Sequence, residues 1–222
     1  MKTKGKVLIL VLCAMLLVVS TVFATVAFLT STDSVQNTFT FGQVIITLDE
    51  AEVTTNGVVV QGADRRHTND YHLIPGHYYV KDPIVHVDAD SETCWLFIKI
   101  DNDLSAIIEG KNTVDANDPA ETVYTIEAQM LKNGWVLIDE QNNVWALNRP
   151  ANAGENIPVF NSFTIKDDAN VALYGTTKDD AGNVTGGAKI DVIAYAVQMD
   201  GFTNAESNQA NASAAWYATF GK

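Results

Sequence analysis

Hydrophobic and polar positions alternate along much of the chain, and this period of two is typical of half-buried β-strands. Residues 37–48 show it clearly, because Phe39 and Phe41 fall on one face, threonines fall on the other, and Gly42 indicates a bend. Similar segments lie at 53–60, 78–87, 93–101, 122–131, 136–138 with 144–147, 158–165 and 188–198. The pattern predicts a protein built mainly of strands.

Turn-forming residues separate several of these segments. Residues 139–143 stand between two apolar runs and predict a β-hairpin, and residues 179–183, followed by Gly186 and Gly187, predict a second one. Strands with short turns are numerous, and strands and helices do not alternate regularly. The chain is therefore predicted to be all-β, an antiparallel β-sandwich of the jelly-roll-like or immunoglobulin-like kind.

One or two short helices are expected within this β-rich chain. Residues 103–110 begin with a capping residue and end at a glycine. Thr203 and Glu206 have the spacing of a capping box, and an alanine-rich run follows to about residue 215. Neither helix is long enough to change the predicted fold class.

The first 27 residues have the organisation of a secretory signal peptide. Three lysines lie within the first six residues, residues 7–19 form an unbroken apolar run, and small residues follow. Signal peptidases cut after small residues, so cleavage is expected between Ala27 and Phe28 or, alternatively, after Ala24. The pattern predicts a secreted protein.

An uncleaved membrane anchor is the alternative interpretation, because no charged residue appears between Val7 and Thr32. Cleavage after residue 27 leaves no stable membrane span. Residues 28–222 contain no low-complexity linker and no internal repeat, so they are expected to form a single β-sandwich domain with an N-terminal strand segment at 28–41.

The composition narrows the classes of function. The 222 residues include 14 Lys and Arg against 27 Asp and Glu, for a net charge of −13. Loss of residues 1–27 removes three lysines and no acid, which makes the charge −16. Nucleic-acid binding is not expected, because phosphate contacts require clustered basic residues. A hydrophobic content of 47% also argues against a disordered acidic tail.

Few residues suggest catalysis or metal binding, and no zinc-protease, nucleophile-elbow or phosphate-loop motif is present. His72 and His77 flank a short turn and are the candidate metal ligands, with His67 and His86 nearby in sequence, but a stable site needs three or four converging ligands. The acidic groups at 88–92 and 115–118 lack the spacing of a calcium loop. We therefore expect no catalytic residues, cofactor or metal.

Cysteine and tryptophan positions favour packing over binding. Cys13 leaves with the signal peptide, so Cys94 is the lone cysteine of the exported form and is expected to be buried in the apolar run 94–98. Trp135 and Trp145 lie on the predicted hairpin, where core packing is favoured over ligand stacking. For Trp216, near the end of the chain, both interpretations stay open.

The chain resembles the TasA/camelysin family, which comprises proteins with a SipW-type signal peptide secreted by Gram-positive bacteria. The resemblance rests on strand and turn motifs at both ends of the chain. These are residues 25–30, 33–42 and 44–48 near the cleavage point, Leu73-Ile74-Pro75-Gly76, Tyr79, Lys81-Asp82-Pro83, residues 94–99 and the late segment 194–202.

This resemblance implies cleavage by a dedicated signal peptidase between Ala27 and Phe28 and a jelly-roll-like domain at the cell surface or in the extracellular matrix. It further implies that the freed N-terminal segment of one subunit completes the sheet of the next in a biofilm-matrix fibre. The donor-strand residues would then be Phe28, Leu29, Val35, Phe39 and Phe41. An extended segment can add to a sheet edge in this way through main-chain hydrogen bonds.

Three functions follow as hypotheses. The first is a fibre-forming structural subunit that associates with itself. The second is a monomeric surface-displayed binding or adhesion module. The third is a secreted hydrolase such as a camelysin-like metallopeptidase, although the sequence has no recognisable zinc motif.

Overall fold

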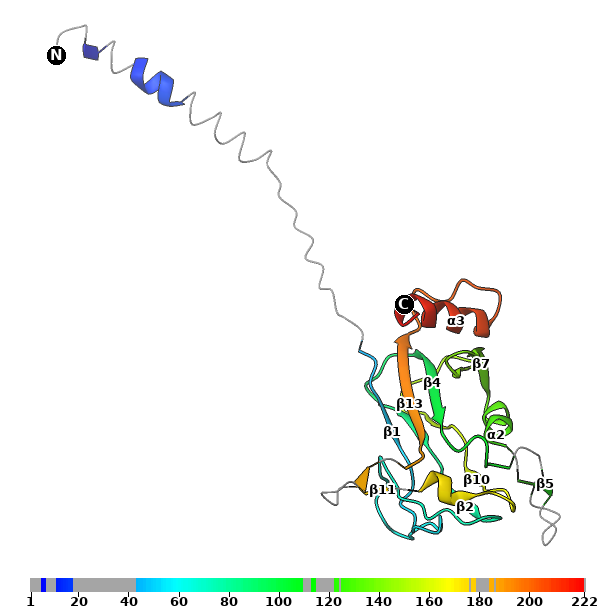
Figure 1. The fold of residues 1–222 in the computed structure, drawn as a ribbon. Helices are drawn as coiled ribbons and strands as arrows, with labels where there is room; N and C mark the ends of the chain where they lie inside the picture. The colour runs from blue at the N-terminus through cyan, green and yellow to red at the C-terminus, as the bar shows by residue number, and fades with distance from the viewer. Residues whose placement is uncertain are drawn as a thin grey trace. The chain divides into compact units, whose positions relative to one another are not determined.

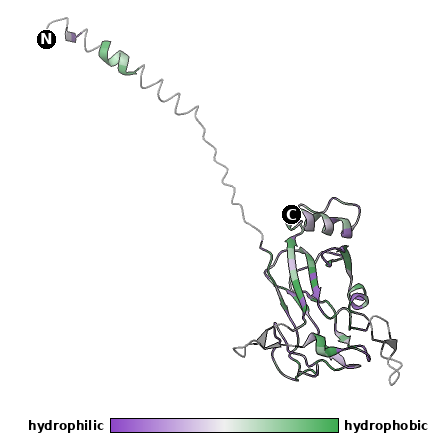
Figure 2. Ribbon diagram, in the orientation of Figure 1, coloured by the Kyte–Doolittle hydropathy of each residue, from purple (hydrophilic) through white to green (hydrophobic). Residues whose placement is uncertain are grey.

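The computed structural model describes residues 5–6, 11–17, 43–109, 113–114, 122–123, 125–175, 177–178, 184–185 and 187–221. The chain divides into two units, Met1–Phe41 and Gly42–Lys222. In the first unit, residues 11–17 form a hydrophobic helix (Figure 2). Within the described residues, no helix combines the length and the apolar character needed to cross a membrane.

The second unit is mostly β and contains a four-stranded antiparallel sheet (Figure 1). Its strands are, in order, β13 (Ile190–Gln198), β4 (Cys94–Asn102), β8 (Val144–Leu147) and β7 (Trp135–Asp139). All nine residues of β13 pair with β4. β7 and β8 form the hairpin that the sequence predicts around residues 139–143.

The remaining strands form smaller antiparallel sheets. A three-stranded sheet has the order β1 (Ile46–Asp49), β3 (Ile84–Val87) and β9 (Asn156–Pro158). The two-stranded sheets pair β10 (Ser162–Thr164) with β2 (Tyr78–Val80), β5 (Thr113–Val114) with β6 (Thr122–Val123), and β11 (Thr177–Lys178) with β12 (Val184–Thr185). The pairing of β11 with β12 confirms the second predicted hairpin, although its turn, residues 179–183, lies outside the described residues.

Among the described residues of the second unit, three short helical elements accompany the sheets. Helix α2 (Ile126–Lys132) has Thr125 as its N-cap, and the Thr125 hydroxyl accepts a hydrogen bond from the Ala128 N–H. Helix α3 (Asn208–Thr219) has Ser207 as its N-cap, and the Ser207 hydroxyl accepts a hydrogen bond from the Ala210 N–H. A 3₁₀ turn, η1, spans Val171–Tyr174.

Strand β4 separates two apolar cores because its side chains alternate between the two faces of the sheet. Leu96, Ile98 and Ile100 face the main core, which also contains side chains of the three-stranded sheet such as Val85. Trp95 and Phe97 face a second core, which is completed by Ala212, Ala215 and Trp216 of α3. Helix α3 thus covers the outer face of the four-stranded sheet.

Two predictions about local structure are wrong in these segments. Residues 122–131 were expected to form a strand, but only 122–123 do, since Thr125 caps a helix that buries Ile126 and Met130 one turn apart. The helix expected at 103–110 is absent from the described residues 103–109. Turns occupy that segment instead, and Ile108 forms a bridge with Ile165.

The C-terminal helix exists but starts later than predicted. Thr203 and Glu206 do not form its capping box, because Ser207 is the N-cap and the side chain of Asn211 turns back to accept from the Ala205 N–H. Three long predicted strands are also interrupted. Residues 53–60 form a turn closed by the Val53–Val59 bridge, residues 78–87 divide before Pro83, and residues 158–165 divide between β9 and β10.

Candidate functional site

The candidate site is a pair of neighbouring sheet edges. The four-stranded sheet ends at β7 and β13, and the three-stranded sheet ends at β9 and β1. Pro158 lies on β9 and has no N–H to offer another strand. β7 carries a register shift between Leu137 and Asp139, and α2 packs against it. Both features discourage strand addition, and the end of β1 is covered by the Glu50–Arg66 bridge, so β13 is the less protected edge.

The backbone of β13 has one side without a strand partner among the described residues. The Met199 N–H donates to the Thr93 carbonyl, and the Asp103 N–H donates to the Lys189 carbonyl. In an antiparallel pair such bonded positions recur at every second residue, so the odd-numbered residues of β13 bond to β4. The even-numbered residues therefore direct their N–H and C=O groups away from β4. We call this side of residues 190–198 the β13 edge.

The even-numbered side chains of the β13 edge from Ile190 to Ala196 are apolar and incompletely covered, whereas Asp191 on the opposite face is charged and exposed. Ile190, Val192, Ala194 and Ala196 pack against the main core but remain only partly buried. On the opposite face Ile193 is 40% exposed. An added strand would therefore find apolar surface and backbone groups that no strand of the described residues pairs with.

β1 lies beside β13 and contacts it, but the two strands belong to different sheets and are not paired (Figure 1). Ile46 and Leu48 of β1 are also only partly buried against the main core. A strand that bonded to the β13 edge would therefore lie next to β1 as well.

Polar contacts hold the end of β1 in place. The guanidinium of Arg65 bonds to the carboxylates of Asp49 and Asp82, and His86 Nε2 lies 2.9 Å from Asp49 Oδ1. Partial burial by itself would raise the pKa of the Asp49 carboxyl. Hydrogen bonds from Arg65 and His86 outweigh this effect and hold that pKa below its ordinary value. Asp49 therefore stays ionised and connects β1 to His86 of β3 and to Arg65 of the loop between β1 and β2.

The predicted metal candidates, His72 and His77, make contacts of other kinds. His77 Nε2 lies 2.9 Å from the Asn56 carbonyl oxygen, and the His72 backbone N–H donates to the Thr55 carbonyl. His67 Nδ1 lies 2.9 Å from the Leu48 carbonyl oxygen. Across the described part of the chain, no three His, Cys, Asp or Glu side chains converge as a metal site.

The cysteine and tryptophan side chains are packed inside the protein. Cys94 is fully buried, and burial raises the pKa of its thiol to about 11, which keeps it protonated and unreactive at neutral pH. The indole N–H of Trp135 donates to the Pro158 carbonyl. Trp145 and Trp216 are 5% and 7% exposed. Packing is thus confirmed for Trp135 and Trp145, and Trp216 belongs to the second core.

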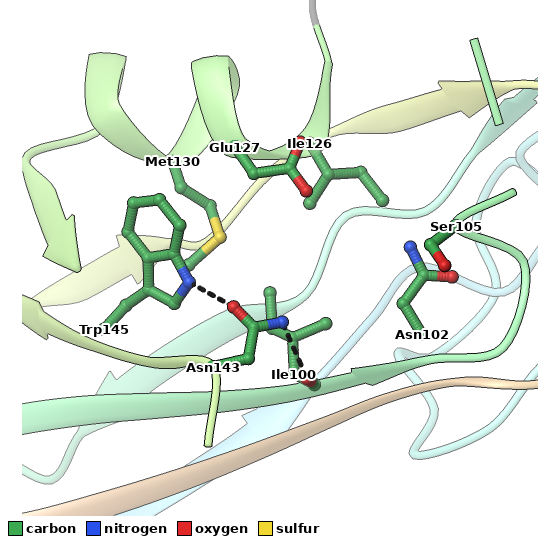
Figure 3. Close-up of a pocket in the computed structure, with 8 residues that line it drawn as sticks. All are labelled: Ile100, Asn102, Ser105, Ile126, Glu127, Met130, Asn143 and Trp145. Carbon is green, nitrogen blue, oxygen red and sulfur yellow. Dashed lines mark hydrogen bonds between the residues drawn. The ribbon is translucent and has the colours of Figure 1, made fainter. Parts of the chain in front are cut away.

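A small cavity of about 160 Å³ lies between α2 and the four-stranded sheet (Figure 3). Ile100, Met130 and Trp145 supply apolar lining, and the side chain of Asn143 bonds both the Trp145 indole N–H and the Ile100 carbonyl. The lining includes one carboxylate, Glu127, and no nucleophile with an adjacent base. The cavity therefore offers packing space rather than a recognisable catalytic arrangement.

Several residues singled out in the sequence lie outside the described residues. These are the cleavage residues Ala24, Ala27 and Phe28, the donor-strand residues Leu29, Val35, Phe39 and Phe41, and the acidic group 115–118. In the other acidic group, the Asp88 carboxylate accepts a hydrogen bond from the Asp90 N–H in an exposed turn.

Sequence reasoning located the strand at 188–198 but not its place at the edge of the sheet. Strand order depends on pairing between distant segments, for which a single sequence gives no local signal.

Comparison of the chain with protein-family models, with curated proteins and with solved structures found no match. The evidence on function therefore comes from the residues of this chain and their arrangement.

Proposed function

We propose that this chain is a secreted structural subunit of fibres at the cell surface or in the extracellular matrix. Its N-terminal segment, residues 28–41, would add to the β13 edge of the next subunit. The observation that carries the proposal is the nine-residue edge strand β13, whose outward side has no strand partner among the described residues. As a finer description of the fold, we propose a jelly-roll-like sandwich.

The proposed contact uses two kinds of interaction. Main-chain groups of the added segment would bond to the even-numbered residues of β13, while its apolar side chains would cover Val192, Ala194 and neighbouring residues. Phe39 and Phe41 have the spacing of two that places side chains on one face of a strand. Phe28, Leu29 and Val35 supply the other apolar positions.

The geometry of such a contact favours fibres over closed oligomers. The added segment and the accepting edge are different surfaces of the subunit, so each copy can donate at one place and accept at another. Head-to-tail contacts of this kind propagate when the rotation between subunits does not close a ring. The proposed partner is therefore another copy of the same chain.

Removal of the signal peptide would control assembly. The resemblance to the TasA/camelysin family supports cleavage by a dedicated signal peptidase between Ala27 and Phe28, after export. Before cleavage, the apolar run at 7–19 precedes the donor segment and hinders its insertion into another subunit. Because cleavage follows export, the donor segment becomes available only outside the cell, and assembly takes place there.

Negative-stain electron microscopy tests the proposal. Protein that begins at Phe28 should form filaments above a threshold concentration, whereas the same protein with a blocking N-terminal extension or without residues 28–39 should remain monomeric. Filaments from the truncated protein would refute strand donation by the N-terminus. Monodisperse particles from all three proteins would favour the surface binding module, and metal-dependent peptide cleavage would favour the peptidase.

A further inference from the structure

Three side chains of complementary chemistry meet beside the connection between β1 and β2. Glu50 follows β1 and is 4% exposed, Asn69 lies within the connection, and Lys81 follows β2. Lys81 Nζ donates to Glu50 Oε2 at 2.6 Å, and Asn69 Nδ2 donates to Glu50 Oε1 at 3.0 Å. One buried carboxylate thus holds an amine and a carboxamide side by side.

The carboxamide of Asn69 is fixed in one orientation by its hydrogen bonds. Its Oδ1 accepts from the Val53 N–H at 3.0 Å, and its Nδ2 donates to the Ala51 carbonyl at 2.8 Å as well as to Glu50. If the carboxamide oxygen and nitrogen were exchanged, the NH₂ group would face the Val53 N–H, and both are donors. The hydrogen bonds therefore determine which atom of the Asn69 carboxamide is the oxygen. The Val53 N–H polarises the carbonyl and is placed to stabilise negative charge that develops on Oδ1.

Water has little access to the amine and the carboxylate, and the carboxamide of Asn69 is partly buried. The side chain of Lys81 is 12% exposed and that of Glu50 is 5% exposed. Burial, and then the negative charge of Glu50, raise the pKa of the neighbouring Tyr71 hydroxyl. Few water molecules can therefore compete with the amine for the carboxamide carbon, and an enclosed site strengthens each polar contact within it.

We propose that Lys81 and Asn69 form an intramolecular isopeptide bond, with Glu50 as the catalytic acid and base. Glu50 accepts a proton from the Lys81 ammonium, and the neutral Nζ attacks Cγ of Asn69, a movement that the flexible lysine stem allows. Negative charge passes to Oδ1, opposite the Val53 N–H. Glu50 then protonates Nδ2, the Cγ–Nδ2 bond breaks, and ammonia leaves and carries away the second lysine proton as ammonium.

The products balance the reactants. An ammonium, a carboxylate and a carboxamide become a secondary amide, the regenerated Glu50 carboxylate and an ammonium ion, and no oxidant or reductant is needed. The new bond would fasten residue 69 to residue 81 and hold the long connection between β1 and β2. Such a cross-link stabilises the fold by restricting the unfolded chain, as a disulfide does. It needs no cysteine and does not depend on fibre formation.

Peptide mapping of the purified, denatured protein tests the inference directly. A protease that cuts before aspartate separates residues 64–69 from residues 70–81, because Asp64, Asp70 and Asp82 lie at the boundaries. We expect these two peptides to be recovered joined, at their summed mass less one ammonia. Two separate, unmodified peptides would overturn the proposal.

Loss of ammonia alone is not sufficient evidence, because Asn69 precedes Asp70 and can close to a succinimide on the backbone nitrogen of Asp70, which also blocks cleavage between the two peptides. The joined species must therefore show two N-termini, at Asp64 and Asp70, on fragmentation, and a single continuous peptide 64–81 would also overturn the proposal. The E50Q and K81R variants should each lose the joined species, with K81R retaining a positive charge beside Glu50. The K99R variant changes a lysine on the sheet surface and should retain the joined species in full.

Discussion

At the residue scale, several charged side chains contact one another around the end of β1. Asp49 accepts from Arg65 and His86, and Arg65 also bonds Asp82 and two backbone carbonyls. These side chains are between 23% and 30% exposed, so their contacts are partly shielded from solvent. Loss of Asp49 leaves Arg65 and His86 without one partner each, which costs more than loss of an exposed ion pair.

The D49N variant should lower the free energy of unfolding by about 1–3 kcal/mol at pH 7. Because the folded pKa of Asp49 lies below its unfolded value of about 3.9, this contribution is full above about pH 5 and is lost as pH falls through the folded pKa. Urea unfolding of both proteins across this range measures the difference. The D101N control changes an exposed ion pair with Lys99 and should lose almost no stability at any pH in this range. A loss in D49N that grows as the pH falls would contradict the lowered pKa of Asp49.

At the element scale, helix α3 depends on one aromatic side chain. The Trp216 ring lies 5.2 Å from the Phe97 ring and 4.8 Å from the Phe220 ring, measured between centroids. The W216A variant should cost about 3–5 kcal/mol of stability, because it leaves a cavity over Trp95 and Phe97. The neighbouring Y217A variant removes a side chain that is 49% exposed and should cost less than about 1 kcal/mol. Equal losses in thermal or urea unfolding would show that α3 is not held through Trp216.

Strand β13 allows a backbone test of assembly. An A194P variant removes an N–H that points away from β4 and should leave the bonds to β4 intact, since proline is tolerated on that side of an edge strand. We expect folded protein with at least a tenfold loss of filament mass in a pelleting assay. The A194S variant keeps the N–H and should assemble normally. Normal filaments from a folded A194P protein would exclude the β13 edge as the acceptor.

Elements set by local patterns were predictable, and those set by distant contacts were not. The alternation in residues 94–98 and the turn formers at 139–143 act within a few residues, so β4 and the β7–β8 hairpin were predicted correctly. In residues 122–131 the period-two and helical patterns overlap, and the Thr125 cap decides in favour of the helix. The contact between Glu50 and Lys81 joins residues 31 positions apart and has no local signal.

At the scale of the whole molecule, negative charge opposes the proposed assembly. The exported form would carry a net charge of −16, so each subunit repels the end of a growing filament. Strand addition uses hydrogen bonds and apolar contacts, which act at short range and do not cancel this repulsion at a distance. Salt reduces the repulsion, because the screening length falls to about 8 Å at 0.15 M ionic strength.

Filament growth of protein that begins at Phe28 should therefore be faster, and its threshold concentration lower, at 0.15 M salt than at 0.01 M, where the screening length is about 30 Å. Light scattering during growth, with pelleting at the end point, measures both quantities. Protein with the blocking N-terminal extension has nearly the same charge and should stay monomeric at either salt concentration, which separates specific strand addition from salt-induced aggregation. Slower growth at the higher salt concentration would mean that attraction between charged groups, rather than strand addition against repulsion, drives the contact between subunits.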